Sequence, residues 1–195
     1  LSPRAKFPLF YLMSILITGS SGYLGTELCR RLQDDTSVDE VVGVDVLSPR
    51  EPFEKLTFYE RDCCADLTDI FNGRNVDTVV HLVFVLNPLH NSEKMYRINV
   101  GSLENMLRYV KHFGVGRVVV TTSGTAYGAY ADNPDRLTED MPIRGHDYQY
   151  ANDKRIVEEK LAEFQSQYSD VDVVIARPAV VCGPHVGNFI SRYVT

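Results

Sequence analysis

A tyrosine and a lysine stand four residues apart in the segment YANDK, at Tyr150 and Lys154. A helix is expected over 149–168, and positions i and i+4 share one face of a helix, so the phenol and the ammonium would lie together. A phenol beside a cation can exchange a proton with a substrate hydroxyl. The same pair also fits a solvated helix face with an extended lysine. Ser123, at the end of a predicted strand, adds a hydroxyl where parallel sheets bind ligands.

A second chemical signal is the glycine-rich segment TGSSGYLG, residues 18–25, which follows a predicted strand and opens a predicted helix. Gly19 permits a tight turn, Gly22 lets the backbone approach a pyrophosphate, and Gly25 allows the helix to pack closely on the strand. Free N–H groups and the positive end of the helix dipole would then face an anion. An ordinary tight loop is the alternative interpretation, but the context favours a dinucleotide site.

An acidic residue, Asp45, ends the second predicted strand, 26 residues after Gly19. A carboxylate at this place accepts hydrogen bonds from a ribose 2′-hydroxyl and repels a 2′-phosphate. The sequence therefore predicts NAD as the cofactor, in preference to NADP.

Short β-branched strands alternate with amphipathic helices along the chain, which is typical of a parallel sheet with helices on both faces. The predicted fold class is α/β, a doubly wound, Rossmann-like sheet. The glycine segment, Asp45 and Ser123 would then share the carboxyl edge of the sheet. Strands are expected at 15–18, 40–46, 57–59, 77–82, 117–122 and 171–176, and helices at 23–33, 93–113 and 149–168.

Composition narrows the class of protein further. The 195 residues suit about one domain, and 20 basic against 26 acidic residues give a net charge of −6. This balance argues against a protein that coats nucleic acid or an anionic membrane, and no apolar run approaches the ~20 residues of a membrane span. The four cysteines form no CxxC pair, so we expect neither a metal site nor a disulfide framework and place the protein in the cytoplasm.

Taken in order, the motifs resemble those of the extended short-chain dehydrogenases/reductases, the NAD-dependent epimerase/dehydratase group. The resemblance runs from Ser14 to about His185, and five or more motifs in order are far more specific than any one alone. They are TGSSGYLG (18–25), Asp45, Asp62, HL (81–82), INVGS (98–102), TTSGTAYG (121–128), YANDK (150–154) and RPAVVCGP (177–184).

The resemblance implies a role for each matching residue. Tyr150 would be the catalytic acid/base, Lys154 its partner, and Ser123 the hydroxyl that binds the substrate oxygen. Asp62 and Cys63 would lie by the adenine, Leu82 and Val83 along the cofactor, and Ala176 near the nicotinamide. The full set expected to bind NAD is Gly19, Ser21, Gly22, Tyr23, Leu24, Gly25, Asp45, Asp62, Cys63, Leu82, Val83, Tyr150, Lys154 and Ala176.

Departures from the family pattern bear on the reaction. Gly124 and Thr125 stand where 4,6-dehydratases carry an extra acid and base, which disfavours water elimination. Val83 replaces a usual alanine and narrows the space beside the cofactor. The predicted function is a nucleotide-sugar epimerase. The alternatives are a dehydrogenase or reductase of another alcohol or carbonyl substrate, and a non-catalytic dinucleotide-binding protein.

The resemblance also implies a domain organisation and a partner. We expect leader residues at 1–12, an NAD-binding domain at 13–184, and at 185–195 the start of a substrate lobe that is largely absent from these 195 residues. A homodimer is expected through the helices at 93–113 and 149–168, with Met106, Tyr109 and Phe164 as contact candidates.

Overall fold

Six parallel strands form one sheet in the computed structural model, which describes residues 13–85, 91–146, 148–184 and 186. The strand order is β3-β2-β1-β4-β5-β6, so successive strands are added on one side of β1 and then, from β4 on, on the other side. Such sheets bind ligands in the crevice at this point, between β1 and β4. The predicted doubly wound α/β class is confirmed. The strands are β1 Ser14–Thr18, β2 Glu40–Asp45, β3 Leu56–Glu60, β4 Val76–His81, β5 Arg117–Thr121 and β6 Asp172–Ala176.

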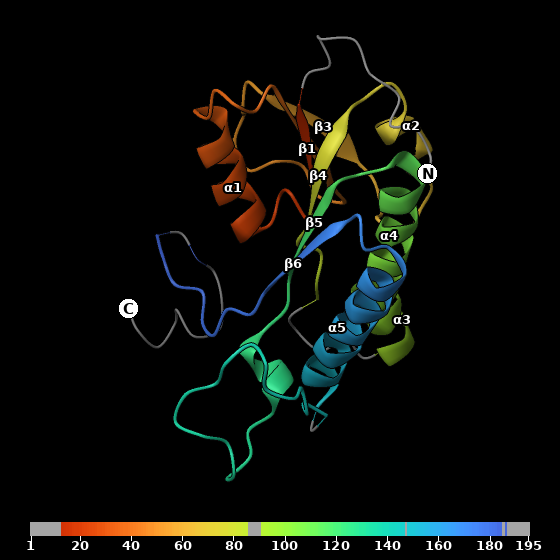
Figure 1. Cartoon of the computed structure of the whole chain (residues 1–195). Helices are drawn as coiled ribbons and strands as arrows, with labels where there is room; N and C mark the ends of the chain where they lie inside the picture. The colour runs from red at the N-terminus through yellow and green to blue at the C-terminus, as the bar shows by residue number, and fades with distance from the viewer. Residues whose placement is uncertain (1–12, 86–90, 147, 185, 187–195) are drawn as a thin grey trace.

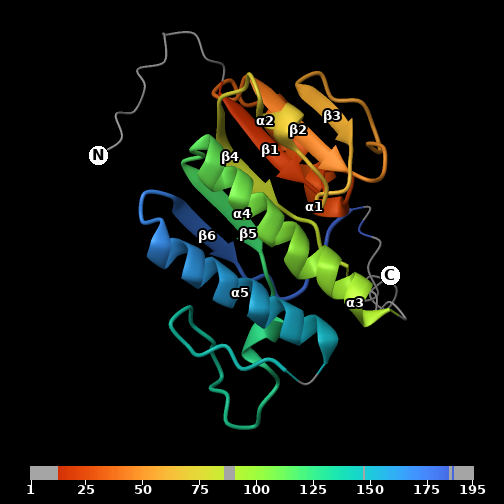
Figure 2. The ribbon, with the colours of Figure 1, turned by 90° about the vertical axis from the view of Figure 1, so that its right-hand side faces the viewer.

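Helices lie on both faces of the sheet, with α1 on one side and α3, α4 and α5 on the other (Figure 1). Figure 2 shows α4 and α5 side by side across the strands. The helices are α1 Tyr23–Gln33, α2 Thr68–Phe71, α3 Ser92–Tyr96, α4 Ser102–Phe113 and α5 Gln149–Gln167, with a π turn η1 at Arg97–Gly101 and a 3-10 turn η2 at Gly124–Tyr127. No helix in the described part of the chain is both long and apolar enough to span a membrane.

The main core lies between the sheet and the pair α4 and α5. Leu16, Val79 and Val118 from three neighbouring strands pack with Leu103 and Leu161 from the two helices, and all five are fully buried. Burial on this scale contributes about 1.5–3 kcal/mol for each large aliphatic side chain. This packing fixes α5, and with it the tyrosine and lysine, against the sheet.

The predicted helix 93–113 is confirmed as a continuous helical stretch, made of α3, the π turn and α4 in succession. Within this stretch the Ser102 hydroxyl donates to the Ile98 carbonyl at 2.5 Å and lies 3.3 Å from His81. A π turn adds a residue to the helical turn and commonly marks a functional site. Here the turn carries the buried Asn99.

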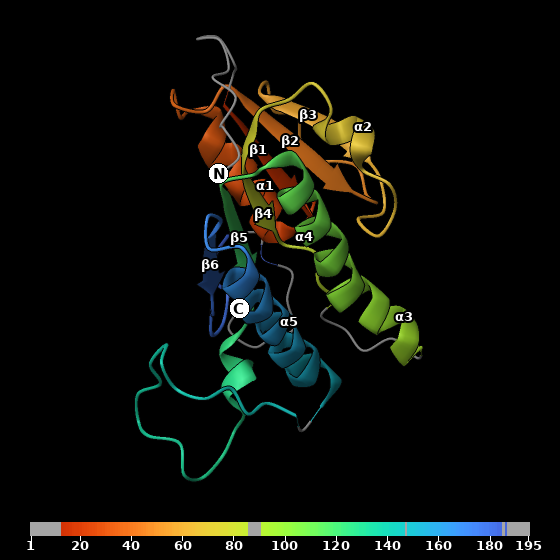
Figure 3. The ribbon, with the colours of Figure 1, turned by 45° about the vertical axis from the view of Figure 1, so that its right-hand side comes forward.

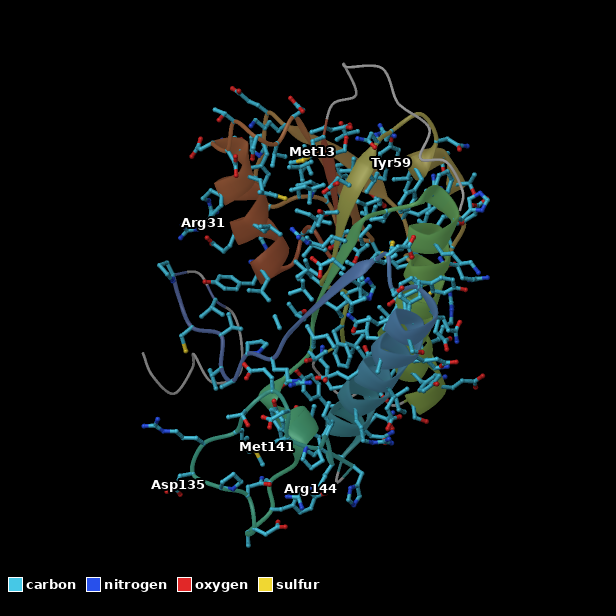
Figure 4. All side chains as sticks on the ribbon, viewed as in Figure 1. Met13, Arg31, Tyr59, Asp135, Met141 and Arg144 are labelled. Carbon is cyan, nitrogen blue, oxygen red and sulfur yellow. The ribbon has the colours of Figure 1, made fainter. Side chains whose placement is uncertain are left out.

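A long loop between η2 and α5 extends away from the sheet (Figure 3). Asp135, Met141 and Arg144 lie on it, far from the strands (Figure 4). Its base is fixed because the amides of Arg144 and Gly145 both donate to the Ala126 carbonyl. The expected leader at 1–12, and all of 185–195 except Val186, lie outside the described residues.

Candidate functional site

The glycine segment forms the turn between β1 and α1. Gly19 has φ +72°, which favours glycine, and an added Cβ would lie 3.0 Å from the Leu82 carbonyl carbon. At Gly25 an added Cβ would lie 2.3 Å from the Gly19 oxygen. Helix α1 begins after Gly22 without a side-chain cap, so its first N–H groups are available to an anion.

Asp45, at the end of β2, is tied directly to this turn. Its Oδ2 accepts from the Ser21 amide at 3.0 Å and its Oδ1 from the Leu47 amide at 3.1 Å. Each carboxylate oxygen keeps a further lone pair for a ligand hydroxyl. The Arg50 guanidinium also reaches the turn, because its Nε donates to the Ser21 carbonyl at 3.1 Å.

Tyr150 and Lys154 lie on the first turns of α5, opposite the glycine segment. The Lys154 Nζ donates to the Thr121 carbonyl at the end of β5, at 2.9 Å. The Tyr150 hydroxyl is hydrogen-bonded to Ser123. Ser123 in turn accepts from the Thr125 amide at 3.2 Å, which orients its hydroxyl. The three residues that the sequence predicted as catalytic therefore form one cluster.

Burial shifts both titratable groups of this cluster. It raises the pKa of Tyr150 above its ordinary value, with a smaller opposing effect from the Ser123 hydrogen bond. It lowers the pKa of Lys154 to about 7, although the carboxylates of Glu158 and Asp153 oppose the shift. Lys154 is only 3% exposed, and desolvation disfavours its charged form. The neutral tyrosine thus stands beside a lysine that titrates near physiological pH.

A cavity of about 330 Å³ lies between the glycine segment and α5. It brings together eight of the residues predicted from the sequence: Gly19, Gly22, Tyr23, Leu24, Gly25, Leu82, Tyr150 and Lys154. Residues that the sequence analysis did not select complete its lining: Arg50, Phe84, Thr121, Thr122, Pro178, Val181 and Val186. The backbone of the glycine segment and the side chains of Tyr150 and Lys154 therefore face the same space.

The other predicted residues lie outside this lining. Ser21 and Asp45 are joined at its edge, as described above. Cys63 is buried, and burial together with the nearby Asp45 raises the pKa of its thiol to about 12, so it is not a reactive thiol. Asp62 pairs with Arg97 at 2.9 Å.

Two further predicted residues are held by backbone contacts near the strand ends. The Ala176 carbonyl, at the end of β6, accepts from the Thr122 amide at 2.7 Å. The Val83 amide lies 3.1 Å from where a Cβ on Gly19 would stand. The roles of these residues remain predictions.

His81, at the end of β4, is buried and contacts two hydroxyl groups within the protein. Its Nδ1 lies 2.8 Å from the Thr18 hydroxyl and its Nε2 lies 3.3 Å from the Ser102 hydroxyl. Burial, helped by the charge of Lys154, lowers its pKa to about 3, so it is neutral. In the described ranges no three histidine, cysteine or acidic side chains are grouped to hold a metal.

The family to which the chain belongs follows from a match to a family model. The model described as "NAD dependent epimerase/dehydratase family" matches residues 15–195. The chain belongs to this family. The resemblance inferred from the motifs is confirmed, and NAD is the family's cofactor.

The relatives include a UDP-glucose 4-epimerase and proteins solved with NAD. The chain is 29% identical over 199 residues to a UDP-glucose 4-epimerase of Bacillus subtilis, covering 92% of this chain and 56% of the relative. MoeE5, solved with UDP-glucuronic acid and NAD, is similar at TM-score 0.77 and 25% identity, covering 92% of this chain and 59% of that one. Bordetella bronchiseptica WbmH, solved with NAD⁺, is similar at TM-score 0.77 and 25% identity, covering 90% and 59%. The chain spans about half the length of the curated relatives it matches.

The residues of this family member fit NAD on two independent observations. Gly19 and Gly25 leave no room for side chains where the backbone must come close to a ligand, and the uncapped start of α1 offers N–H groups to a pyrophosphate. On the opposite wall, the Lys154 ammonium and the Tyr150 hydroxyl are donor groups that line the same cavity.

Proposed function

We propose that this chain carries the cofactor site and the catalytic residues of an NAD-dependent nucleotide-sugar epimerase. One observation carries the proposal: the glycine turn and the Tyr150–Lys154 pair line the same cavity. The UDP-glucose 4-epimerase relative and the UDP-glucuronic acid bound to MoeE5 support a nucleotide-activated sugar as substrate.

The cofactor would be held from two sides. The amides at the start of α1 bind the pyrophosphate, and Asp45 accepts from the adenosine ribose. Lys154 donates to the nicotinamide ribose. NAD⁺, when bound, supplies the acceptor for a hydride and a positive charge close to Tyr150.

The proton would be handled by Tyr150. It takes the proton from a substrate hydroxyl as the carbon loses hydride, and returns it when the ketone is reduced. Burial keeps Tyr150 protonated at neutral pH in the protein alone, so the phenol must first release its own proton to solvent, a loss that the positive charge of bound NAD⁺ would favour. The Lys154 ammonium favours the tyrosinate, and Ser123 donates to the oxygen on which negative charge develops.

Two outcomes follow from the same first step. An epimerase keeps the ketone bound, presents its other face and reduces it again, whereas a dehydrogenase releases it. Neither Gly124 nor Thr125 offers an acid or base to the reaction, so these residues do not support water elimination.

The test is to incubate the protein, in the full form that its gene encodes, with NAD⁺ and UDP-glucose, and separately with UDP-glucuronic acid. An epimerase forms the C4 epimer with only transient NADH. Net accumulation of NADH and ketone would instead establish a dehydrogenase. Tight NAD binding without turnover of either sugar would contradict the proposal.

Assembly as a homodimer through α4 and α5 is part of the proposal, but two of the contact residues first expected, Met106 and Phe164, are buried in the chain's own core. Met106 is fully buried within the chain and Phe164 is 7% exposed. Tyr109 stacks on Phe71 and donates to Asp66. Apolar residues of α4 and α5 are used by the chain's own core, which the helical pattern could not distinguish from a partner contact.

The groove between α4 and α5 carries both charge signs, including Glu104, Lys111, Lys160 and Glu163. In an isologous contact each patch meets its own copy, so mixed charges can pair across the axis. Sedimentation equilibrium should show a dimer that weakens with added salt, and a monomer at all concentrations would contradict this assembly.

A further inference from the structure

We propose that Phe84 is a positioning residue of the cofactor site, whose ring covers the Lys154 ammonium and shields it from water. This inference rests on the proposed function and deepens it. Phe84 follows β4 in the loop that faces α5, and it lines the same cavity as Tyr150 and Lys154. Neither the motifs nor the family pattern pointed to it.

The Phe84 ring contacts both Lys154 and Tyr150. The Lys154 Nζ lies 3.5 Å from the centroid of the Phe84 ring. The same ring meets Tyr150 edge-on, with centroids 5.1 Å apart and planes at 78°. A cation over an aromatic face is attracted to it, so Phe84 holds the ammonium toward the cavity wall.

The backbone beside Phe84 is fixed by a buried polar chain. The Val85 amide donates to Asn99 Oδ1 at 2.8 Å, and Asn99 Nδ2 donates to Asp153 Oδ2 at 2.8 Å. Gln149 donates to the other oxygen of Asp153 at 2.5 Å. Asp153 is fully buried. The loop after β4 is thereby attached to α5 at the residue next to Lys154, which sets the ring over the ammonium.

The groups that face Lys154 explain why a single aromatic ring can have a large effect on the pKa of this lysine. Asp153, Glu158 and Tyr150 come from α5, and neutral His81 comes from β4. From β5 comes the Thr121 carbonyl, which accepts the ammonium's hydrogen bond. Glu158 and Asp153 are already occupied, the first by Arg177 at 2.6 Å and the second by the two amides.

Since these carboxylates have other partners, desolvation governs the proton affinity of Lys154, and its pKa falls to about 7. The half-buried Phe84 supplies the apolar side of this environment. Removal of the ring would lose its attraction for the ammonium, but it would also admit water. Since desolvation is the larger effect on this lysine, its pKa should rise toward the ordinary value of ~10.4.

The experiment is a calorimetric titration of NAD⁺ into the protein across neutral and alkaline pH. In the parent protein, affinity should be level below about pH 7 and then fall by up to about tenfold per pH unit as Lys154 loses its charge. In Phe84→Ala this fall should begin at least one pH unit higher. Phe84→Leu, which keeps the bulk and excludes water, should restore the parent profile.

Phe53→Ala is the matched control, because Phe53 is also half-buried but packs in the separate cluster beside α1. It should leave the pH profile unchanged. Affinity in Phe84→Ala that changes equally at every pH, with the same midpoint as the parent, would overturn the inference while leaving the proposed function standing. Failure of the parent protein to bind NAD⁺ at all would instead contradict the proposed function.

Discussion

The two walls of the cavity are built by different means. The glycine wall, from β1 to the start of α1, presents backbone, and Gly19 and Gly25 are required because a Cβ would strike the main chain. The α5 wall presents side chains: Tyr150, Lys154 and, from the loop after β4, Phe84. In the proposed function the first wall would recognise an anion with fixed backbone dipoles, whereas the properties of the second wall depend on burial and on neighbouring groups. Substitutions in the two walls should therefore impair the protein in different ways.

The largest effect should come from the α5 wall, through Tyr150→Phe. This change removes only the phenolic oxygen, so the edge-on contact with Phe84 is kept and NAD affinity should change less than about threefold. Hydride transfer should fall by ~100- to 10,000-fold, because a general acid/base is lost. The measurement is single-turnover formation of NADH with a saturating nucleotide sugar.

Tyr168→Phe is the control for this change, since Tyr168 caps the far end of α5. It should react at the parent rate. Transfer at the parent rate by Tyr150→Phe would remove the acid/base assignment and leave only the cofactor-binding wall.

A smaller effect, on NAD affinity instead of hydride transfer, is expected from Gly25→Ala in the glycine wall. The new Cβ would lie 2.3 Å from the Gly19 oxygen and 2.6 Å from the Ser20 Cα, so α1 must shift. Such overpacking costs about 1–3 kcal/mol, and NAD affinity should fall at least tenfold. Calorimetric titration and thermal unfolding check both effects.

Gly101→Ala is the matched glycine control, because a Cβ there meets only the Arg97 Cγ at 3.7 Å. It lies in helical backbone and should be neutral or slightly stabilising. Equal losses in the two variants would show that α1 is not closely packed on the turn.

The smallest effect should be on cofactor choice, through Asp45→Ala. The carboxylate repels a 2′-phosphate, so the parent should bind NAD at least about tenfold more tightly than NADP, and the variant should narrow this gap. Arg50 is a cation on the same cavity, and removal of Asp45 takes away a negative charge that is bound to the same residue of the turn, Ser21. Paired titrations with NAD and NADP measure the change. Equal affinities in the parent would contradict the role of Asp45.

The glycine wall was more predictable from the sequence than the α5 wall for a physical reason. Glycine spacing and strand periodicity are local signals, and α1 runs over Tyr23–Gln33, as expected. Each strand bound lies within one residue of its prediction. The stretch 93–113 is helical as predicted, but the π turn inside it was not foreseen, because a π turn has no pattern of its own in the sequence.

The α5 wall depends on contacts between segments far apart in the chain. Tyr150 and Lys154 gave a local signal, but the burial that shifts their pKa values comes from β4 and β5. Phe84 and Arg50 were not predicted for the same reason. The only signal for Phe84 in the sequence was its position just after β4, and the only signal for Arg50 was a cation five residues after Asp45.

The central claim is that one dinucleotide spans both walls. A crystal structure of the protein with NAD⁺ tests it most directly. The pyrophosphate should lie at the start of α1, beside Gly22, and the nicotinamide end should lie within reach of Tyr150 and Lys154. A cofactor bound outside this cavity, or one bound with its adenine against Lys154, would contradict it.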